Sequence, residues 1–143
     1  MPNLATERIE SVKAGILSSA VFGVVESGIF LIHGFLAIDL GNGFARWQIV
    51  SFVDFSFHLA IAFVSGFLFG VTYRYIIRSD RNSHLQDGAV LAFSLVRGLA
   101  LIEATDFSLL LWLLLLFESI VGFAIARLSL DFALKFKLIK PFI

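Results

Sequence analysis

Long apolar segments separated by short polar connectors form the pattern of this chain. Four such segments cover roughly residues 14–38, 49–77, 88–105 and 107–128. At about 1.5 Å per residue, each is long enough to cross a hydrocarbon core of about 30 Å as an α-helix. Short connectors join antiparallel neighbours, so the pattern predicts one all-α domain over residues 1–143, an integral-membrane, up-down bundle of four transmembrane helices.

The connectors and the two ends of the chain carry polar residues. "DLGNGFARW" contains an Asn-Gly turn signal, "RSDRNSHLQDG" has the composition of a polar loop, and Asp106 marks a tight turn between the last two segments. Charged and apolar residues mix in "TERIESVK" before the first span and in "RLSLDFALKFKLIKPFI" after the last. We expect both to be short amphipathic segments at the membrane interface, with docking onto another protein as the alternative for the tail.

Composition supports a membrane protein and excludes several other classes. Of the 143 residues, 59% are hydrophobic and 15% charged, and the mean hydropathy of +0.94 exceeds what a soluble domain of this size can bury. The formal net charge is zero, which argues against a nucleic-acid partner. The absence of cysteine excludes disulfides, iron–sulfur clusters and thiolate chemistry.

The lysines and arginines predict an orientation. Nine basic residues fall on the side of the two chain ends, whereas the opposite side has only Arg46, in the first connector. By the positive-inside rule, both termini are expected in the cytoplasm, or in the stroma if the membrane is a thylakoid. The nine residues are Arg8, Lys13, Arg74, Arg78, Arg81, Arg127, Lys135, Lys137 and Lys140.

Three charged residues fall near the predicted midplane: Glu26, Arg97 and Glu118. A central charge costs about 2.5–3.5 kcal/mol, while the apolar residues of the third segment together return only about 4 kcal/mol, so that span is marginal by itself. Because an unpaired ion in hydrocarbon is the costliest arrangement, we predict that the Arg97 guanidinium bridges one or both carboxylates. We favour a structural clamp, with a proton or ion relay as the alternative.

A second polar group lies in the outer half of the predicted bundle, formed by His33, Asp54 and His58 with Glu103 at its rim. Imidazoles and carboxylates at similar depth could ligate a metal through His33, His58 and Asp54, or a haem through the two histidines. We favour instead an Asp54–His58 hydrogen bond within one helix, with His33 bonded to a serine or a backbone carbonyl. On the second segment the polar stripe recurs every seven residues, at Ser51, His58, Ser65 and Thr72.

Small and aromatic residues point to packing surfaces. Small residues at every fourth position let two helix backbones approach closely, either within the bundle or in self-association. They are Gly15, Ser19 and Gly23 on the first segment and Ala62, Gly66 and Gly70 on the second. Seventeen phenylalanines exceed what a four-helix core needs, so many are expected to face lipid, although flat aromatic surfaces also suit pigments and quinones.

One stretch of the chain resembles a known group of proteins. The run "LFGVTYRYIIRSDRNSHLQDGAVLAFSLVRGLALIE", residues 68–103, is similar to the central segment of small uncharacterised four-span membrane proteins of cyanobacteria and chloroplasts. The shared elements are the Tyr73-Arg74 pair, the polar "RSDRN-HL" loop and the pattern of Gly88, Arg97 and Gly98. The resemblance covers about a quarter of the chain and implies a thylakoid or bacterial inner membrane and a link to photosynthesis.

The sequence is most consistent with a non-catalytic accessory subunit or assembly factor of a larger membrane complex, since no nucleophile–base pair or phosphate-binding glycine pattern occurs. Its expected partners are lipid, other membrane proteins or a second copy. A small oligomeric transporter of ions, protons or metabolites is the first alternative. A haem or metal protein using His33 and His58 is the second, although no cofactor is predicted and haem, metal or pigment stays an open possibility.

Overall fold

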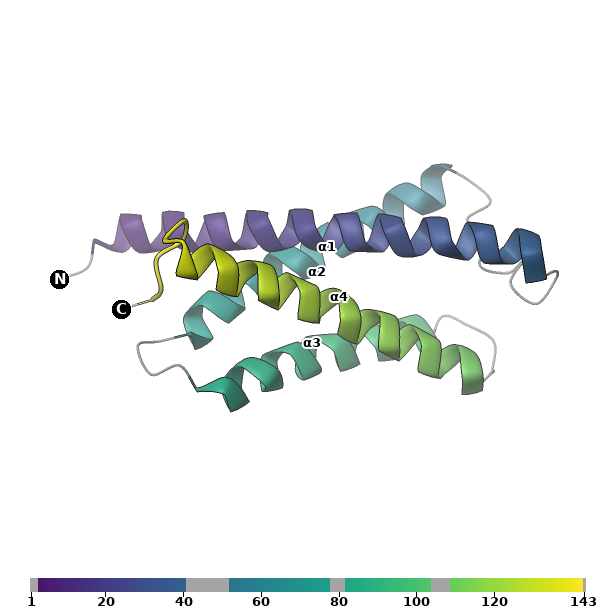
Figure 1. Ribbon diagram of the computed structural model, residues 1–143. Helices are drawn as coiled ribbons and strands as arrows, with labels where there is room; N and C mark the ends of the chain where they lie inside the picture. Colours follow the sequence, from purple (N-terminus) through teal and green to yellow (C-terminus); the bar gives the residue numbers. More distant parts are fainter. Residues whose placement is uncertain (1–2, 41–51, 78–81, 104–108, 143) are drawn as a thin grey trace.

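The computed structural model describes residues 3–40, 52–77, 82–103 and 109–142, which form four helices and no strand. The helices are α1 (Leu4–Leu40), α2 (Phe52–Ile76), α3 (Ser83–Glu103) and α4 (Leu109–Lys135). Figure 1 shows that successive helices run in opposite directions, so that both chain ends lie at one end of the bundle. We name this the terminal end and the opposite one the far end. The predicted all-α class is confirmed.

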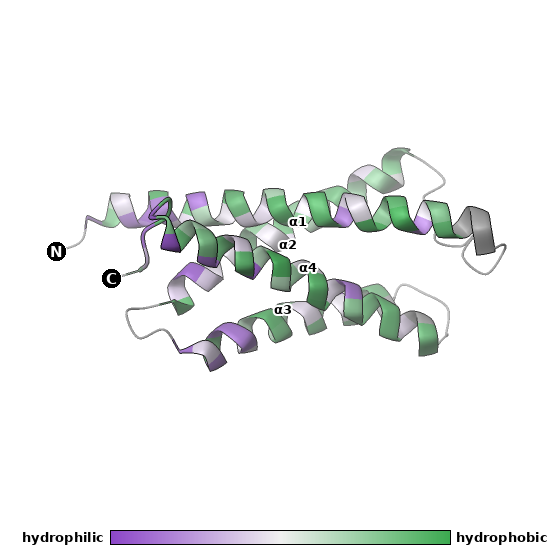
Figure 2. Ribbon diagram, viewed as in Figure 1, coloured by the Kyte–Doolittle hydropathy of each residue, from purple (hydrophilic) through white to green (hydrophobic). Residues whose placement is uncertain are grey.

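Within the described residues, three helices are long and apolar enough to cross a membrane: Leu4–Leu36, Phe55–Ile76 and Trp112–Lys135. The helix that falls short is α3. Its 21 residues suffice for about 30 Å, but its first turns are polar and Arg97 interrupts the apolar remainder. Figure 2 shows this contrast, with hydrophilic residues gathered at the start of α3 and at the terminal end, and apolar residues along the other helices.

Two helices begin earlier than the apolar pattern predicts. The segment "TERIESVK" is not separate from the first span, because α1 is continuous from Leu4. Nor are the last residues of "RSDRNSHLQDG" a loop, because α3 begins at Ser83. There the Asn82 side chain acts as an N-cap, since its Oδ1 accepts a hydrogen bond of 3.0 Å from the His84 backbone N–H. The loops that contain the Asn-Gly turn signal and Asp106 lie outside the described residues.

The small residues of α1 and α2 face each other inside the bundle. A Cβ added at Gly66 would lie 2.9 Å from the Ser19 Cα, and one at Gly15 would lie 2.6 Å from the Phe67 ring. Ser19 also donates a hydrogen bond of 2.9 Å from its Oγ to the Phe63 carbonyl. These stripes therefore hold α1 against α2, as the within-bundle alternative predicts.

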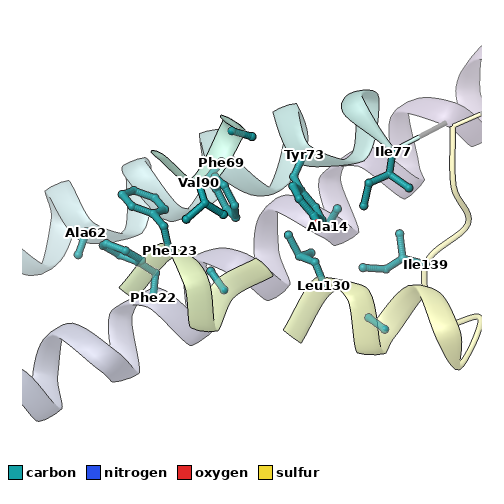
Figure 3. Close-up of a cluster of buried hydrophobic side chains, with 13 residues drawn as sticks. Ala14, Phe22, Ala62, Phe69, Tyr73, Ile77, Val90, Phe123, Leu130 and Ile139 are labelled. Carbon is teal, nitrogen blue, oxygen red and sulfur yellow. The ribbon is translucent and has the colours of Figure 1, made fainter. Parts of the chain in front are cut away.

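Aromatic side chains fill the middle of the bundle. Phe22, Phe69 and Phe123 are fully buried, and Phe93 packs beside them from α3. The ring centroids of Phe22 and Phe123 are 4.4 Å apart, and those of Phe69 and Phe123 are 5.1 Å apart. Figure 3 shows Phe22, Phe69 and Phe123 converging from three helices. All four helices thus contribute to one core.

The C-terminal tail folds back onto the bundle and does not extend away from it. Helix α4 ends in a Schellman motif, in which Leu138 N–H donates to the Ala133 carbonyl at 2.9 Å and Lys137 adopts a left-handed φ of 58°. Ile139 is then buried in the core. The backbone N–H of Lys140 donates to Glu10 Oε2 at 2.9 Å, so the tail is fixed to the first turns of α1.

Candidate functional site

A cavity of about 100 Å³ lies between the four helices, on the far side of the aromatic core. Its walls are apolar and aromatic, and ionisable side chains from every helix face it. The ionisable lining residues are Glu26, His33, His58, Arg97 and Glu118. The remaining lining residues are Ser27, Ile29, Phe30, Phe55, Leu59, Leu101, Leu115 and Ser119. The two polar groups that the sequence places at different depths therefore meet at one site.

Arg97 forms the ion pair that the insertion cost predicts, with one of its two candidate partners. Its Nη2 lies 2.7 Å from Glu26 Oε1, and the arginine side chain is only 7% exposed. The Arg97 Cζ also lies 5.0 Å from the centroid of the Phe22 ring, a cation–π distance. This pair connects α3 to α1, two helices that otherwise meet mainly through side chains.

Glu118 pairs with His33 and not with Arg97. The His33 Nε2 lies 2.6 Å from Glu118 Oε1, with exposed fractions of 12% and 18% for the two side chains. The prediction that His33 bonds to a serine or a backbone carbonyl is thus wrong for this nitrogen. The physical reason is that a carboxylate in an apolar environment binds the nearest available donor, and His33 supplies one across the α1–α4 contact.

The spacing along α1 explains why both ion pairs share one cavity. Seven residues separate Glu26 from His33, about two helical turns, so both side chains lie on one face of α1. Helix α3 meets that face with Arg97 and helix α4 meets it with Glu118. The two pairs are therefore stacked along α1 and connect it to both helices of the α3–α4 hairpin.

Two members of the predicted histidine and aspartate group, His33 and His58, have described side chains, and both line the cavity. His58 is a lining residue of the cavity with an exposed side chain. The side chains of Asp54 and Glu103, and residue Ser51, lie outside the described part of the structure. Ser65 and Thr72 do not line the cavity, so the seven-residue stripe on α2 does not turn one continuous face toward it.

Metal ligation would need three or more suitable side chains close together. The part of the chain that the structure describes contains no such group of histidine, cysteine, aspartate or glutamate residues. His33 Nε2 is already within hydrogen-bonding distance of Glu118. A haem or metal site at His33 and His58 stays a prediction.

The most connected polar residue of the terminal end was not recognised as a site from the sequence. Arg74 is 1% exposed and contacts two separate parts of the chain, the start of α1 and the tail. It donates to Glu7 Oε2 at 2.5 Å, to Ser11 Oγ at 2.7 Å and to the Lys140 carbonyl at 2.9 Å. The available signal is the position of Arg74 in the last turn of an apolar helix, where we interpret it as an orientation charge and as an element of the resemblance.

The cavity can hold a small molecule against hydrogen-bond donors and acceptors in an apolar environment. Two ion pairs supply these groups, and the rings of Phe30 and Phe55, with centroids 5.0 Å apart, supply an aromatic wall.

None of the compared family models, curated proteins or solved structures matches this chain.

Proposed function

We propose that the chain is a four-span integral membrane protein and acts as a non-catalytic accessory or assembly subunit of a larger membrane complex. Both termini lie on the cytoplasmic side in this proposal, or on the stromal side of a thylakoid. The observation that carries it is a rigid surface at the terminal end, formed by residues 4–10 of α1, residues 131–135 of α4 and the tail 136–142. We name this surface the terminal platform.

The terminal platform extends beyond the thickness of a bilayer core. Helix α1 has 37 residues and is therefore about 55 Å long, against about 30 Å of hydrocarbon. The buried Arg74, its partner Glu7 and the Tyr73–Asp131 hydrogen bond of 2.6 Å lie at the level of the platform. Such a concentration of polar groups is typical of the membrane surface, so the platform lies at or beyond the headgroups.

Apolar side chains stand exposed on this platform although the hydrocarbon does not reach it. Five large ones have exposed fractions between 56% and 75%: Leu4, Ile9, Phe132, Phe136 and Leu138. The contacts of Arg74 and Lys140 hold the platform in a fixed shape, so presenting these side chains to a partner costs little further ordering. An exposed apolar surface on a rigid frame favours a protein partner.

Purification from the native membrane in mild detergent tests the proposal. The tagged protein is expected to migrate in a complex of defined composition, larger than a monomer or homodimer. The double variant Ile9→Lys/Phe132→Lys should lose the complex while retaining its melting temperature, because both side chains are exposed. The control Leu110→Lys alters an equally exposed apolar residue near the far end and should retain the complex. Migration of the unaltered protein as a bare monomer or homodimer would contradict the proposal.

Transport of an ion, proton or metabolite is the second candidate, favoured by the ionisable residues at the cavity. The aromatic cluster of Phe22, Phe69, Phe93 and Phe123 fills the bundle between this cavity and the terminal end. A path through one copy therefore requires these rings to move, or a path between copies. Proteoliposomes that show no proton or ion flux under an imposed gradient would eliminate this candidate.

A further inference from the structure

The cavity contains a buried donor that the described chain leaves unsatisfied. Arg97 lines the cavity and its side chain is 7% exposed, yet its Nε has no hydrogen-bond partner among the described residues. Glu26 occupies a different nitrogen of the same guanidinium, Nη2. A buried N–H without an acceptor costs about 1–3 kcal/mol, and more when the donor is charged, so such groups are seldom left unpaired. An acceptor atom from a bound molecule would remove this cost.

The charge of the site restricts what that molecule can be. Two carboxylates, Glu26 and Glu118, face one arginine. The lining groups carry a formal charge of −1 when His33 and His58 are both neutral and zero when one of them is protonated, so neither state has surplus positive charge for an anion. A free carboxylate or phosphate at Nε would also bring another negative charge close to Glu26. A neutral acceptor, such as a carbonyl oxygen, satisfies the donor without changing the charge balance.

The walls of the cavity indicate a lipophilic ligand with a compact ring. Phe30 from α1 and Phe55 from α2 form a tilted ring pair, and Leu59, Leu101 and Leu115 complete an apolar surround. A volume of about 100 Å³ suits a single substituted ring and not a large pigment. His58 lines the cavity and is itself exposed, so the cavity is open at this residue to a ligand from outside the bundle.

We propose that this cavity binds a neutral lipophilic molecule whose compact head group carries carbonyl oxygens, as a quinone ring does, with Arg97 as the donor to that oxygen and with Phe30 and Phe55 against the ring. The claim concerns binding alone and includes no electron transfer. It goes beyond the subunit role proposed above and uses different residues, so either can fail without the other.

Binding is measured with the full-length protein in lipid nanodiscs. Decylubiquinone serves as the probe, and quenching of tryptophan fluorescence as the readout, because Trp112 lies one turn from the lining residue Leu115. Saturable quenching is expected with decylubiquinone. Decylbenzene, which has a ring and tail but no carbonyl, should neither quench saturably nor compete. If decylbenzene competed with decylubiquinone as well as unlabelled decylubiquinone does, binding would depend on apolar contacts alone, and the proposal would be overturned.

Substitutions test separately the contribution of the Arg97 donor and that of the cavity volume to binding. Arg97→Lys keeps a positive charge beside Glu26 but removes the guanidinium Nε, and should weaken decylubiquinone binding about tenfold or more. Leu59→Phe narrows the cavity and should abolish saturation, whereas Leu68→Phe, on an exposed part of α2 away from the lining, should not. Each variant is used after its thermal melt matches that of the unaltered protein, and Leu59→Phe carries the test if Arg97→Lys does not fold.

Two further outcomes would overturn the proposal. If decylpyridinium, a single cationic ring with the same tail, saturates the site and decylubiquinone does not, the carboxylates and not Arg97 select the ligand. If decylubiquinone quenches the unaltered protein and Leu59→Phe to the same extent, the quenching reports partition into lipid and the cavity binds no such molecule.

Discussion

Arg74 shows how one side chain can fix the relative position of three separate chain segments. Its guanidinium contacts the start of α1 through Glu7 and Ser11 and the tail through the Lys140 carbonyl. Replacing it with methionine removes the charge but keeps much of the volume. We expect Arg74→Met to lower the free energy of unfolding by about 3–5 kcal/mol, because Glu7 loses its partner in a mostly buried position. A thermal melt in detergent measures the loss.

Limited proteolysis of Arg74→Met measures whether the C-terminal tail stays attached to the bundle. With Arg74 absent, the tail should detach and become more sensitive to trypsin at Lys135 and Lys137. The matched control is Arg8→Met, since Arg8 is an exposed basic residue on the same end of the bundle. Unchanged tail cleavage in Arg74→Met would show that the tail is held by its apolar contacts, such as those of Ile139, and not by the arginine.

At the residue scale, the sequence could predict that buried charges are paired but not which atoms meet. Depth along each helix brought Arg97 near both Glu26 and Glu118, and the structure forms only the first of these pairs. The choice depends on the rotation of α4 about its own axis, which turns Glu118 toward His33. That rotation follows from close packing of rings such as Phe123 against Phe22, which no count of residues from a helix end can supply.

At the scale of the helices, the α1–α2 contact depends on the absence of side chains. Gly66 lies against the Ser19 Cα and the Ser18 carbonyl, backbone atoms that cannot move aside. Gly66→Leu should therefore separate the two helices and cost about 1–3 kcal/mol or more in a denaturation experiment. Gly28→Leu provides the control, because a Cβ at Gly28 meets nothing within 4 Å, and its stability should be unchanged or slightly raised. Equal losses in both variants would indicate a general effect of bulk in α1 and α2.

The substitution Arg97→Leu should favour membrane insertion of the isolated α3 segment but destabilise the whole protein. In a membrane-insertion assay of the isolated α3 segment, Arg97→Leu removes a cost of about 3 kcal/mol and should raise the inserted-to-uninserted ratio about a hundredfold. In the full chain, the same change leaves Glu26 without its partner and should lower both accumulation and melting temperature.

The second substitution Glu26→Gln, made together with Arg97→Leu, should restore part of the lost stability, since no unpaired charge then stays in the bundle. If the single variant Arg97→Leu accumulates and melts like the unaltered protein, the ion pair is not a clamp. The structural interpretation of the pair would then have to give way to the binding role proposed for Arg97.

Helix ends were the least predictable feature at this scale. An apolar pattern marks the part of a helix that lies in lipid, not the turns that continue beyond it, so α1 was expected to begin at residue 14 and not at Leu4. Likewise α4 continues past residue 128 to Lys135, because the Leu130 and Ala133 side chains still pack in the core. The Schellman motif that ends α4 has no glycine, the residue that usually identifies such a cap in a sequence.

At the scale of the whole molecule, contacts between the two ends of the chain restrict its membrane topology. Lys140 is bonded through its backbone to Arg74 and Glu10, so the tail and the start of α1 lie on the same side of any membrane that the bundle crosses. The polar α3 nevertheless raises three crossings as the alternative to four, which the contacts of Lys140 oppose. With four crossings the tail returns to the side of the N-terminus, whereas with three crossings it would end on the opposite side.

Single-cysteine labelling in sealed vesicles distinguishes the two topologies, and the absence of native cysteine makes every introduced thiol a clean reporter. Four crossings predict that Asn3→Cys, Asn82→Cys and Lys140→Cys react from one side and Leu109→Cys from the other, because Asn82 precedes α3 and Leu109 begins α4. With three crossings, Leu109→Cys would instead react from the same side as Asn82→Cys, and Lys140→Cys from the opposite side.

Proteolysis of the tail gives an independent check of the topology. Three crossings would break the Lys140 contacts with Arg74 and Glu10, so the three-crossing labelling pattern should coincide with full sensitivity of the tail to trypsin. Protected tail lysines together with labelling of Lys140→Cys and Asn3→Cys from one side would therefore establish α3 as a crossing helix, held in the bilayer by the pairing of Arg97 with Glu26.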